Sequence, residues 1–199
     1  MKCFYIVVII ISFQPFFSQV SRGEPINNEN EEEQVIGNYH AIIISENEYE
    51  DQSISDLAEP KNDADKLYKI LLDKYNFNTS AIIKLIDPTR NQIIDALDKK
   101  RKQLSEDDNL LIFYAGHGYW DEGLKMGYWF PSDAKKNNKG NWLANTTLTN
   151  YINAIQARHV LLISDACFSG AIFKTRSVGA MDSGIKRLYD LKSRKAISS

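Results

Sequence analysis

The sequence predicts an α/β domain in which a mostly parallel β-sheet is flanked by helices. Short aliphatic segments alternate with amphipathic segments of helical periodicity between residues 40 and 164. The aliphatic segments lack the apolar–polar alternation of a half-exposed strand, which indicates burial on both faces. Such strands, joined through helices, pair in parallel with right-handed crossovers. A chain of 199 residues with 43% hydrophobic residues is long enough for one domain of this kind.

Residues 1–21 are predicted to be a cleaved signal peptide. Lys2 precedes an apolar run over residues 4–13, and polar residues follow it. This run is shorter than the roughly 18 apolar residues of a membrane-spanning helix, so signal removal is favoured over an uncleaved membrane anchor. We therefore expect a secreted or periplasmic protein without a stable membrane anchor.

Residues 22–37 are predicted to be an acidic linker, and residues 38–199 to be the folded domain. The linker "RGEPINNENEEEQVIG" is polar and has few side chains to bury. At the other end, "KSRKAISS" over residues 192–199 has the pattern of the start of a fifth strand. We therefore expect the domain to be incomplete at its C-terminus.

The helices and strands inside the domain follow from periodicity and from signals at their ends. Leu67, Ile70 and Leu71 fall on one helical face, with Asn62 as a candidate N-cap, and Thr89 is expected to cap the next helix. The expected strands are 40–45, 80–86, 109–114 and 159–164, and the expected helices are 62–75, 89 to about 104, and about 148–156. Residues 121–145 form a polar segment with tryptophans, in which a hairpin is expected around residues 127–134.

Among the three histidines of the chain, the predicted strands single out His117. In an open parallel sheet, catalytic groups gather beyond the carboxyl ends of the strands. His40 and His159 open the first and fourth strands at the opposite edge, and His159 lies more than about 20 Å from Cys167. His117 follows the third strand and Cys167 follows the fourth, so both are expected at the carboxyl edge. Strands consecutive in sequence are often neighbours, which predicts that His117 faces Cys167.

Cys167 is the one cysteine left after signal removal, because the other is Cys3. An imidazole beside a thiol can hold it as the nucleophilic thiolate and can later protonate a leaving amine. The backbone N–H groups of Gly118 and Cys167 are candidates for an oxyanion hole. The glycines on both sides of His117, Gly116 and Gly118, are expected to let a substrate approach the backbone closely.

Each of these features has a plainer alternative. A lone cysteine after an apolar strand is often a buried small hydrophobe, and "GHG" can be a turn. A zinc site at His117 and Cys167 lacks further ligands at a suitable spacing, so no metal site is assigned. A phosphate-binding loop at "AGHGYW" lacks the Lys-Ser/Thr pair of that motif. The thiol and the imidazole at one sheet edge favour catalysis.

The segments "YAGHG" and "DACFSG", each after a predicted strand, resemble those of caspase-like cysteine peptidases, the bacterial and metacaspase types more than the animal caspases. "AIIISENEY", "NDA" at residues 62–64 and "YWFPSDA" add to a resemblance that covers about residues 40–198. His117 and Cys167 match the caspase separation of about 50 residues. The resemblance implies the caspase fold, endopeptidase activity, His117 as general base and acid, and Cys167 as nucleophile.

The sequence departs from this family at three places. Ala115 stands where metacaspase-type enzymes often have serine, Phe168 stands where many have histidine, and the family's domain normally continues beyond the end of this chain. A catalytically inactive or fragmentary caspase-like module, acting by binding or regulation, is therefore the alternative to a peptidase.

The same resemblance implies that Asp63 and Asp165 line the pocket for the residue before the scissile bond. Two nearby carboxylates repel unless a cation lies between them. A substrate guanidinium supplies that cation and forms bidentate hydrogen bonds, which favours Arg over Lys. We therefore expect cleavage after basic residues. Helix capping by Asp63 and a turn hydrogen bond by Asp165 are the alternatives.

The expected partner is a protein or peptide substrate with Arg or Lys before the scissile bond. The formal net charge of −2 at pH 7 gives no sign of nucleic-acid binding. No cofactor is expected. Calcium stimulation occurs among the metacaspases that the sequence resembles, but no site is assigned for it, and no oligomeric state is predicted.

Overall fold

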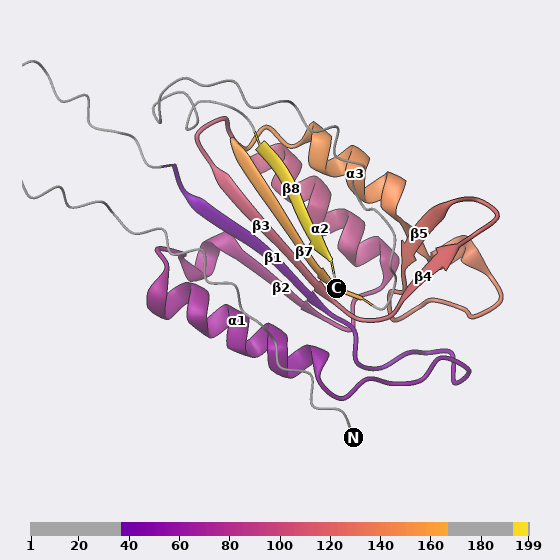
Figure 1. Ribbon diagram of the computed structural model, residues 1–199. Helices are drawn as coiled ribbons and strands as arrows, with labels where there is room; N and C mark the ends of the chain where they lie inside the picture. The colour runs from indigo at the N-terminus through magenta and orange to yellow at the C-terminus, as the bar shows by residue number, and fades with distance from the viewer. Residues whose placement is uncertain (1–36, 167–192, 199) are drawn as a thin grey trace, which may run out of the picture. The chain divides into compact units, whose positions relative to one another are not determined.

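The computed structural model describes residues 37–166 and 193–198 (Figure 1). The predicted signal peptide, all of the predicted linker except Gly37, and Cys167 with Phe168 lie outside these residues. Within the described part of the chain, no helix is long and apolar enough to cross a membrane.

The structure confirms a parallel central sheet flanked by helices. Its strands follow the order β2–β1–β3–β7–β8, and every neighbouring pair is parallel. The strands are β1 (Tyr39–Ser45), β2 (Ile82–Ile86), β3 (Asn109–Ala115), β7 (His159–Asp165) and β8 (Ser193–Ser198). The fifth strand expected at residues 192–199 is therefore present as β8, beside β7.

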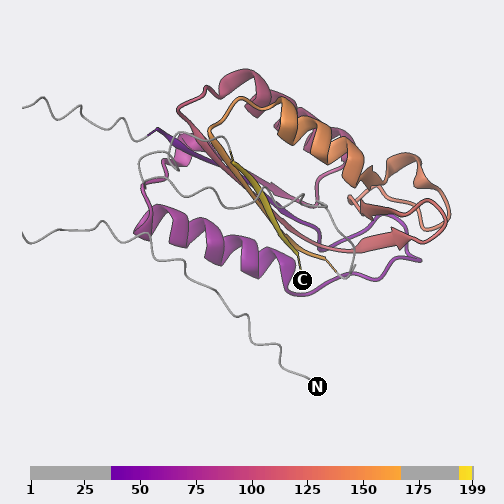
Figure 2. The same ribbon diagram turned by 45° about the horizontal axis from the view of Figure 1, so that its top comes forward.

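Helices cover both faces of this sheet, as Figure 2 shows. The three helices of the described residues are α1 (Pro60–Lys74), α2 (Arg90–Gln103) and α3 (Asn145–Ala154). Ala41 and Ile43 of β1 pack in one cluster with Leu71 of α1, whereas Ile42 and Ile44 pack with residues of α2 and α3. Both faces of β1 are buried for this reason, which explains its unbroken aliphatic sequence.

The helix α1 begins earlier than the sequence predicts. Its N-cap is Glu59 and its first residue is Pro60, so Asn62 lies inside the helix and does not cap it. Proline suits the first helical position, where no intrahelical bond from its nitrogen is needed. The predicted apolar face is also narrower, because Ile70 is 46% exposed while Leu71 is buried.

The ends of α2 and α3 can be compared with the helix boundaries predicted from the sequence. Thr89 caps α2 as expected, and with Gln92 it forms a capping box. Leu104 is the C-cap of α2 and is buried. The helix α3 begins at Asn145 and not at residue 148.

The segment between His117 and α3 contains a second, antiparallel sheet in the order β4–β5–β6. Its strands are β4 (Gly118–Asp121), β5 (Met126–Trp129) and β6 (Leu143–Ala144), and the short 3-10 helix η2 (Lys139–Asn141) precedes β6. The hairpin joins β4 to β5, so it begins before the predicted position. Tyr128 and Trp142 are buried in a cluster on this sheet, so the segment is not simply polar. The small sheet starts directly after His117 and helps to position it.

Candidate functional site

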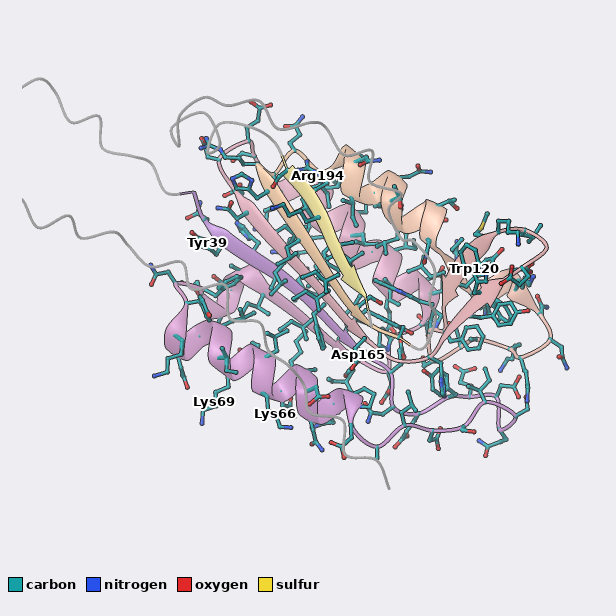
Figure 3. The ribbon with its side chains drawn as sticks, viewed as in Figure 1. Tyr39, Lys66, Lys69, Trp120, Asp165 and Arg194 are labelled. Carbon is teal, nitrogen blue, oxygen red and sulfur yellow. The ribbon has the colours of Figure 1, made fainter. Side chains whose placement is uncertain are left out.

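The carboxyl ends of β3 and β7 lie side by side, with Ala115 aligned with Asp165. This confirms that the third and fourth predicted strands are neighbours. His117 follows the end of β3 by two residues, and Cys167 follows Asp165 by two residues. Asp165 is labelled at this edge in Figure 3. Cys167 lies outside the described residues, so its contact with His117 stays a prediction.

The other two histidines lie at the amino edge, as predicted, in β1 and at the start of β7. His40 is buried, with its Nδ1 atom 3.2 Å from Nζ of Lys100 and its Nε2 atom 3.6 Å from a carboxylate oxygen of Asp108. Burial, followed by the charge of Lys100, lowers the pKa of His40. Burial likewise lowers the pKa of Lys100 to about 8. This cluster holds the amino edge together, far from the carboxyl edge.

Three hydrogen bonds hold the backbone of His117. Its N–H donates to the Tyr49 hydroxyl at 3.0 Å. Its carbonyl accepts from the Tyr114 hydroxyl at 2.7 Å and from the Phe130 N–H at 3.0 Å. Tyr114 is itself fully buried and stacks on Trp129 with ring centroids 4.0 Å apart. The main chain at His117 is thus anchored to both sheets.

The imidazole of His117 is half-buried, and within residues 37–166 and 193–198 its ring has one polar partner. Nε2 lies 2.8 Å from the carbonyl oxygen of Ser55, and the rings of Tyr49 and His117 are 5.3 Å apart. A carbonyl oxygen only accepts hydrogen bonds, so Nε2 carries the hydrogen and Nδ1 of the neutral ring carries the lone pair. This tautomer leaves Nδ1 able to take a proton.

The loop that supplies Tyr49 and Ser55 runs from β1 to α1. A carboxylate oxygen of Asp87 accepts the N–H groups of Asn47 and Glu48, and one of Asp56 accepts the Tyr49 N–H at 3.1 Å. Sequence reasoning missed Tyr49 and Ser55 as partners of His117. The available signal was the mostly polar stretch "ENEYEDQSIS" at residues 46–55, which follows the first strand at the same sheet edge.

Glu46 lies fully buried at the end of β1, with no hydrogen-bond partner for either carboxylate oxygen among residues 37–166 and 193–198. The nearby Ser132 N–H donates to the Pro88 carbonyl instead. Burial, reinforced by the carboxylates of Asp87 and Asp133, raises the pKa of Glu46 to about 10. The side chain is therefore protonated and uncharged at neutral pH.

Packing requires a glycine at position 116. A Cβ atom at this position would lie 2.7 Å from the Tyr114 hydroxyl and 2.9 Å from Cβ of Glu46. The glycine before His117 therefore lets the chain turn closely over both side chains.

The predicted substrate-binding and oxyanion residues lie on elements that meet at the carboxyl edge. Asp63 lies in the first turn of α1, with its side chain 17% exposed and 3.3 Å from Nζ of Lys66. The N-cap of α1 is Glu59, so the capping alternative for Asp63 is wrong. Asp165 ends β7 and is exposed, and Gly118 begins β4. The predicted roles of all three residues stay predictions.

In the described ranges, no group of three or more His, Cys, Asp or Glu side chains is arranged to hold a metal ion. Within those ranges, the carboxyl edge carries an oriented imidazole whose Nδ1 atom has no hydrogen-bond partner, which suits proton transfer.

If His117 is a general base, Tyr49→Phe should lower kcat by roughly two- to tenfold and leave KM unchanged. The change keeps the ring beside His117 but removes the acceptor of its N–H, a hydrogen bond of about 0.5–1.5 kcal/mol. Steady-state hydrolysis of a fluorogenic peptide measures both constants. Tyr75→Phe, at an exposed position, is the matched control. A wild-type kcat in Tyr49→Phe would show that this bond does not position His117.

Solved structures of other proteins share this fold. A protein from Geobacter sulfurreducens superposes with a TM-score of 0.54 at 23% identity, over 68% of this chain and 52% of that one. Caspase-1 from Spodoptera frugiperda superposes with a TM-score of 0.53 at 19% identity, over 81% of this chain and 60% of that one. Its proform, pro-Sf-caspase-1, gives 0.52 at 18% identity, over 83% and 60%. The chain thus spans about half to three fifths of the length of these proteins.

A comparison of sequence identifies the family of the chain. The sequence model of the caspase domain matches residues 38–196. No curated protein matches the chain. The structural likenesses, all below 25% identity, show the α/β fold with its mainly parallel sheet.

Proposed function

Since this chain belongs to the caspase domain family, we propose that it is a cysteine endopeptidase of the metacaspase or bacterial caspase-like type, with His117 and Cys167 as its catalytic pair. The proposal includes cleavage after arginine or lysine and export of the protein through removal of residues 1–21. It requires no cofactor, and any stimulation by calcium would be an addition to this chemistry.

The orientation of His117 is the observation that carries the proposal. The Ser55 carbonyl accepts the hydrogen of Nε2, and the bonds to Tyr49, Tyr114 and Phe130 fix the main chain. The contact with the Ser55 carbonyl fixes the tautomer and the main-chain bonds fix the position of the residue, as a general base requires. The neighbouring strand β7 ends two residues before Cys167, the only thiol close in sequence to this edge.

In the proposed reaction, Nδ1 of His117 takes the proton of the Cys167 thiol. The thiolate attacks the carbonyl carbon of the scissile bond, and the N–H groups of Gly118 and Cys167 stabilise the oxyanion that forms. The imidazolium then gives its proton to the leaving amine as the C–N bond breaks. Water hydrolyses the resulting thioester, with His117 again accepting a proton, and the thiol is restored.

Specificity for basic residues rests on Asp63 and Asp165. Asp63 lies in the first turn of α1, which packs on the face of β1 and β3, and Asp165 ends β7, which pairs with β3. Lys66 lies 3.3 Å from Asp63, so a substrate cation would compete with an internal one for that carboxylate. Asp165, which is exposed, is the acid nearer to Cys167 in sequence.

Asp165→Asn should lower kcat/KM for peptides with Arg before the scissile bond by about 30-fold, equivalent to about 2 kcal/mol. This value lies at the low end for loss of a charge partner, because water screens an exposed carboxylate. The measurement uses fluorogenic peptides that differ only at that residue, with Arg, Lys, Gln or Asp. Asp73→Asn, an exposed change on α1, is the matched control. A preference for Asp, or unchanged Arg selectivity in both Asp165→Asn and Asp63→Asn, would contradict the proposed specificity.

A further inference from the structure

The ammonium group of Lys139 is enclosed by three aromatic rings and a carboxylate. Its Nζ atom lies 5.8 Å from the ring centroid of Tyr119, 5.6 Å from that of Tyr128 and 5.7 Å from that of Trp142. The carboxylate of Asp121 forms an ion pair with the same nitrogen. We call Tyr119, Tyr128, Trp142 and Asp121 the aromatic cage.

The composition of the aromatic cage selects for cations. The faces of aromatic rings attract a positive charge through their quadrupoles, and a carboxylate adds a full negative charge. The hydrogen bond from Lys139 lowers the pKa of Asp121, which keeps this acid ionised. Neither an anion nor an uncharged polar group would be stabilised electrostatically by these rings and this carboxylate.

Two of the three rings of the aromatic cage are buried, whereas the third ring and the lysine are partly exposed. Tyr128 and Trp142 are only 7% and 6% exposed, whereas Tyr119 and the side chain of Lys139 are each 42% exposed. Trp142 packs against Phe130 with ring centroids 4.5 Å apart. Tyr128 and Trp142 are therefore held by packing that does not involve the lysine, and the partly exposed lysine side chain already contacts water.

The loop that carries Lys139 does not depend on its ammonium group. The Asn138 side chain accepts the Gly140 N–H at 2.9 Å. The Trp142 N–H donates to the Lys139 carbonyl at 3.1 Å, and the Trp142 indole N–H donates to the Lys135 carbonyl at 2.9 Å. These bonds hold η2 through its main chain and neighbours, so the ammonium group is free to exchange.

The aromatic cage is joined to the predicted catalytic histidine. Tyr119 follows His117 by two residues, a span of at most about 7 Å along the chain. The Phe130 N–H donates to the His117 carbonyl at 3.0 Å, and the ring of Phe130 lies 6.5 Å from that of Tyr119. The cage lies on the small sheet that carries Trp120, which is labelled in Figure 3. If a substrate peptide binds with its scissile bond beside the His117 side chain, its residues near that bond come within reach of the cage.

We propose that the aromatic cage is a second subsite for a basic side chain of the peptide substrate, and that Lys139 occupies it until the substrate's cation displaces it. The inference rests on the proposed peptidase function. It differs from the specificity assigned to Asp63 and Asp165, because it concerns a residue other than the one before the scissile bond. When the substrate's cation replaces the Lys139 ammonium group, the rings and the Asp121 carboxylate keep a positive charge as their partner.

A direct binding experiment tests whether the cage accepts an external cation. Tetramethylammonium is the probe, because it has no hydrogen-bond donors and favours aromatic faces over a pair of carboxylates. Its binding to the full chain is followed through the indole N–H signal of Trp142 in NMR spectra, with sodium chloride at equal ionic strength as reference. We expect Lys139→Met to bind the probe at least fivefold more tightly than wild type, because the internal competitor is gone.

Two further variants make this result decisive. Lys125→Met removes a lysine that pairs with Glu122 in the turn of the same hairpin, and this variant should bind like wild type. Adding Tyr119→Leu to Lys139→Met should return the affinity to the wild-type level. Equal affinity of wild type and Lys139→Met, or tight binding that survives Tyr119→Leu, would overturn the cage as a cation site.

A cleavage experiment tests the role in substrate binding. All peptides of the series have one basic residue before the scissile bond. A second Lys or Arg is placed in turn at each of three positions on either side of that residue and bond. At one of these positions, we expect kcat/KM to be at least threefold higher than for the peptide without a second base. Lys139→Met should raise kcat/KM for that peptide threefold further by lowering KM. The peptide without a second base should be unaffected. Indifference to the second base would overturn the subsite. Absence of all cleavage would instead overturn the proposed peptidase function, and the binding experiment would still decide whether the cage accepts a cation.

Discussion

Replacing His117 or Cys167 by alanine is expected to abolish peptide hydrolysis, with a loss in kcat of at least roughly 10³-fold. The change at His117 removes the proposed base, and the change at Cys167 removes the proposed nucleophile. Because the two residues act as a unit, loss of either one removes nearly the whole catalytic contribution of the pair. The double variant should therefore be no less active than either single one. Fluorogenic peptide hydrolysis measures the loss, and far-UV circular dichroism checks that the fold is retained.

His159→Gln is the matched control for the loss of a histidine. His159 lies at the amino edge of the sheet, where its Nδ1 atom is 2.9 Å from the Ser193 hydroxyl, so this change should leave kcat close to wild type. A folded His117→Ala or Cys167→Ala variant with wild-type turnover would refute the catalytic pair. An inactive wild-type chain would favour the non-catalytic caspase-like module.

Glu46→Gln is expected to stabilise the protein increasingly as pH rises from 6 to 8, by up to about 1.4 kcal/mol per pH unit. In the unfolded chain Glu46 loses its proton near its ordinary pKa of 4.5, whereas burial raises the folded pKa to about 10. Between these values the folded state binds more protons, so the stability of the wild type falls as pH rises. Glutamine keeps the size of the side chain but cannot ionise, so the variant lacks this loss.

The free energy of unfolding of both proteins is measured by urea titration at pH 6, 7 and 8. His40 and Lys100, whose pKa values are also shifted, affect wild type and variant alike, so the difference between the two proteins isolates Glu46. Glu48→Gln, an exposed change two residues away, should give a difference that does not vary with pH. A similarly constant difference for Glu46→Gln would mean that the folded protein carries Glu46 in its charged form.

The central sheet could be predicted from the sequence because β1, β3 and β7 carry aliphatic side chains on both faces. The aliphatic runs in β1, β3 and β7 are stable only where they are buried in a core. The helices between them require these strands to pair in parallel. Element ends were less certain, as the start of α1 at Pro60 illustrates. The second sheet was largely missed because β4 and β5 mix aromatic and polar residues over four positions each, and β6 has only two residues.

The choice of His117 among the histidines followed from the sequence alone, because the position of a residue along a parallel strand decides which sheet edge it occupies. The partners of that histidine were decided only by the tertiary structure. Ser55 and Tyr49 lie 62 and 68 residues before it, in a loop without periodicity. The burial of Glu46 and the aromatic cage around Lys139 likewise depend on how loops fold back over the ends of the strands. Hydrophobic patterns determine which segments enter the core, whereas loop paths depend on individual polar contacts between distant residues, and these leave no pattern in the sequence.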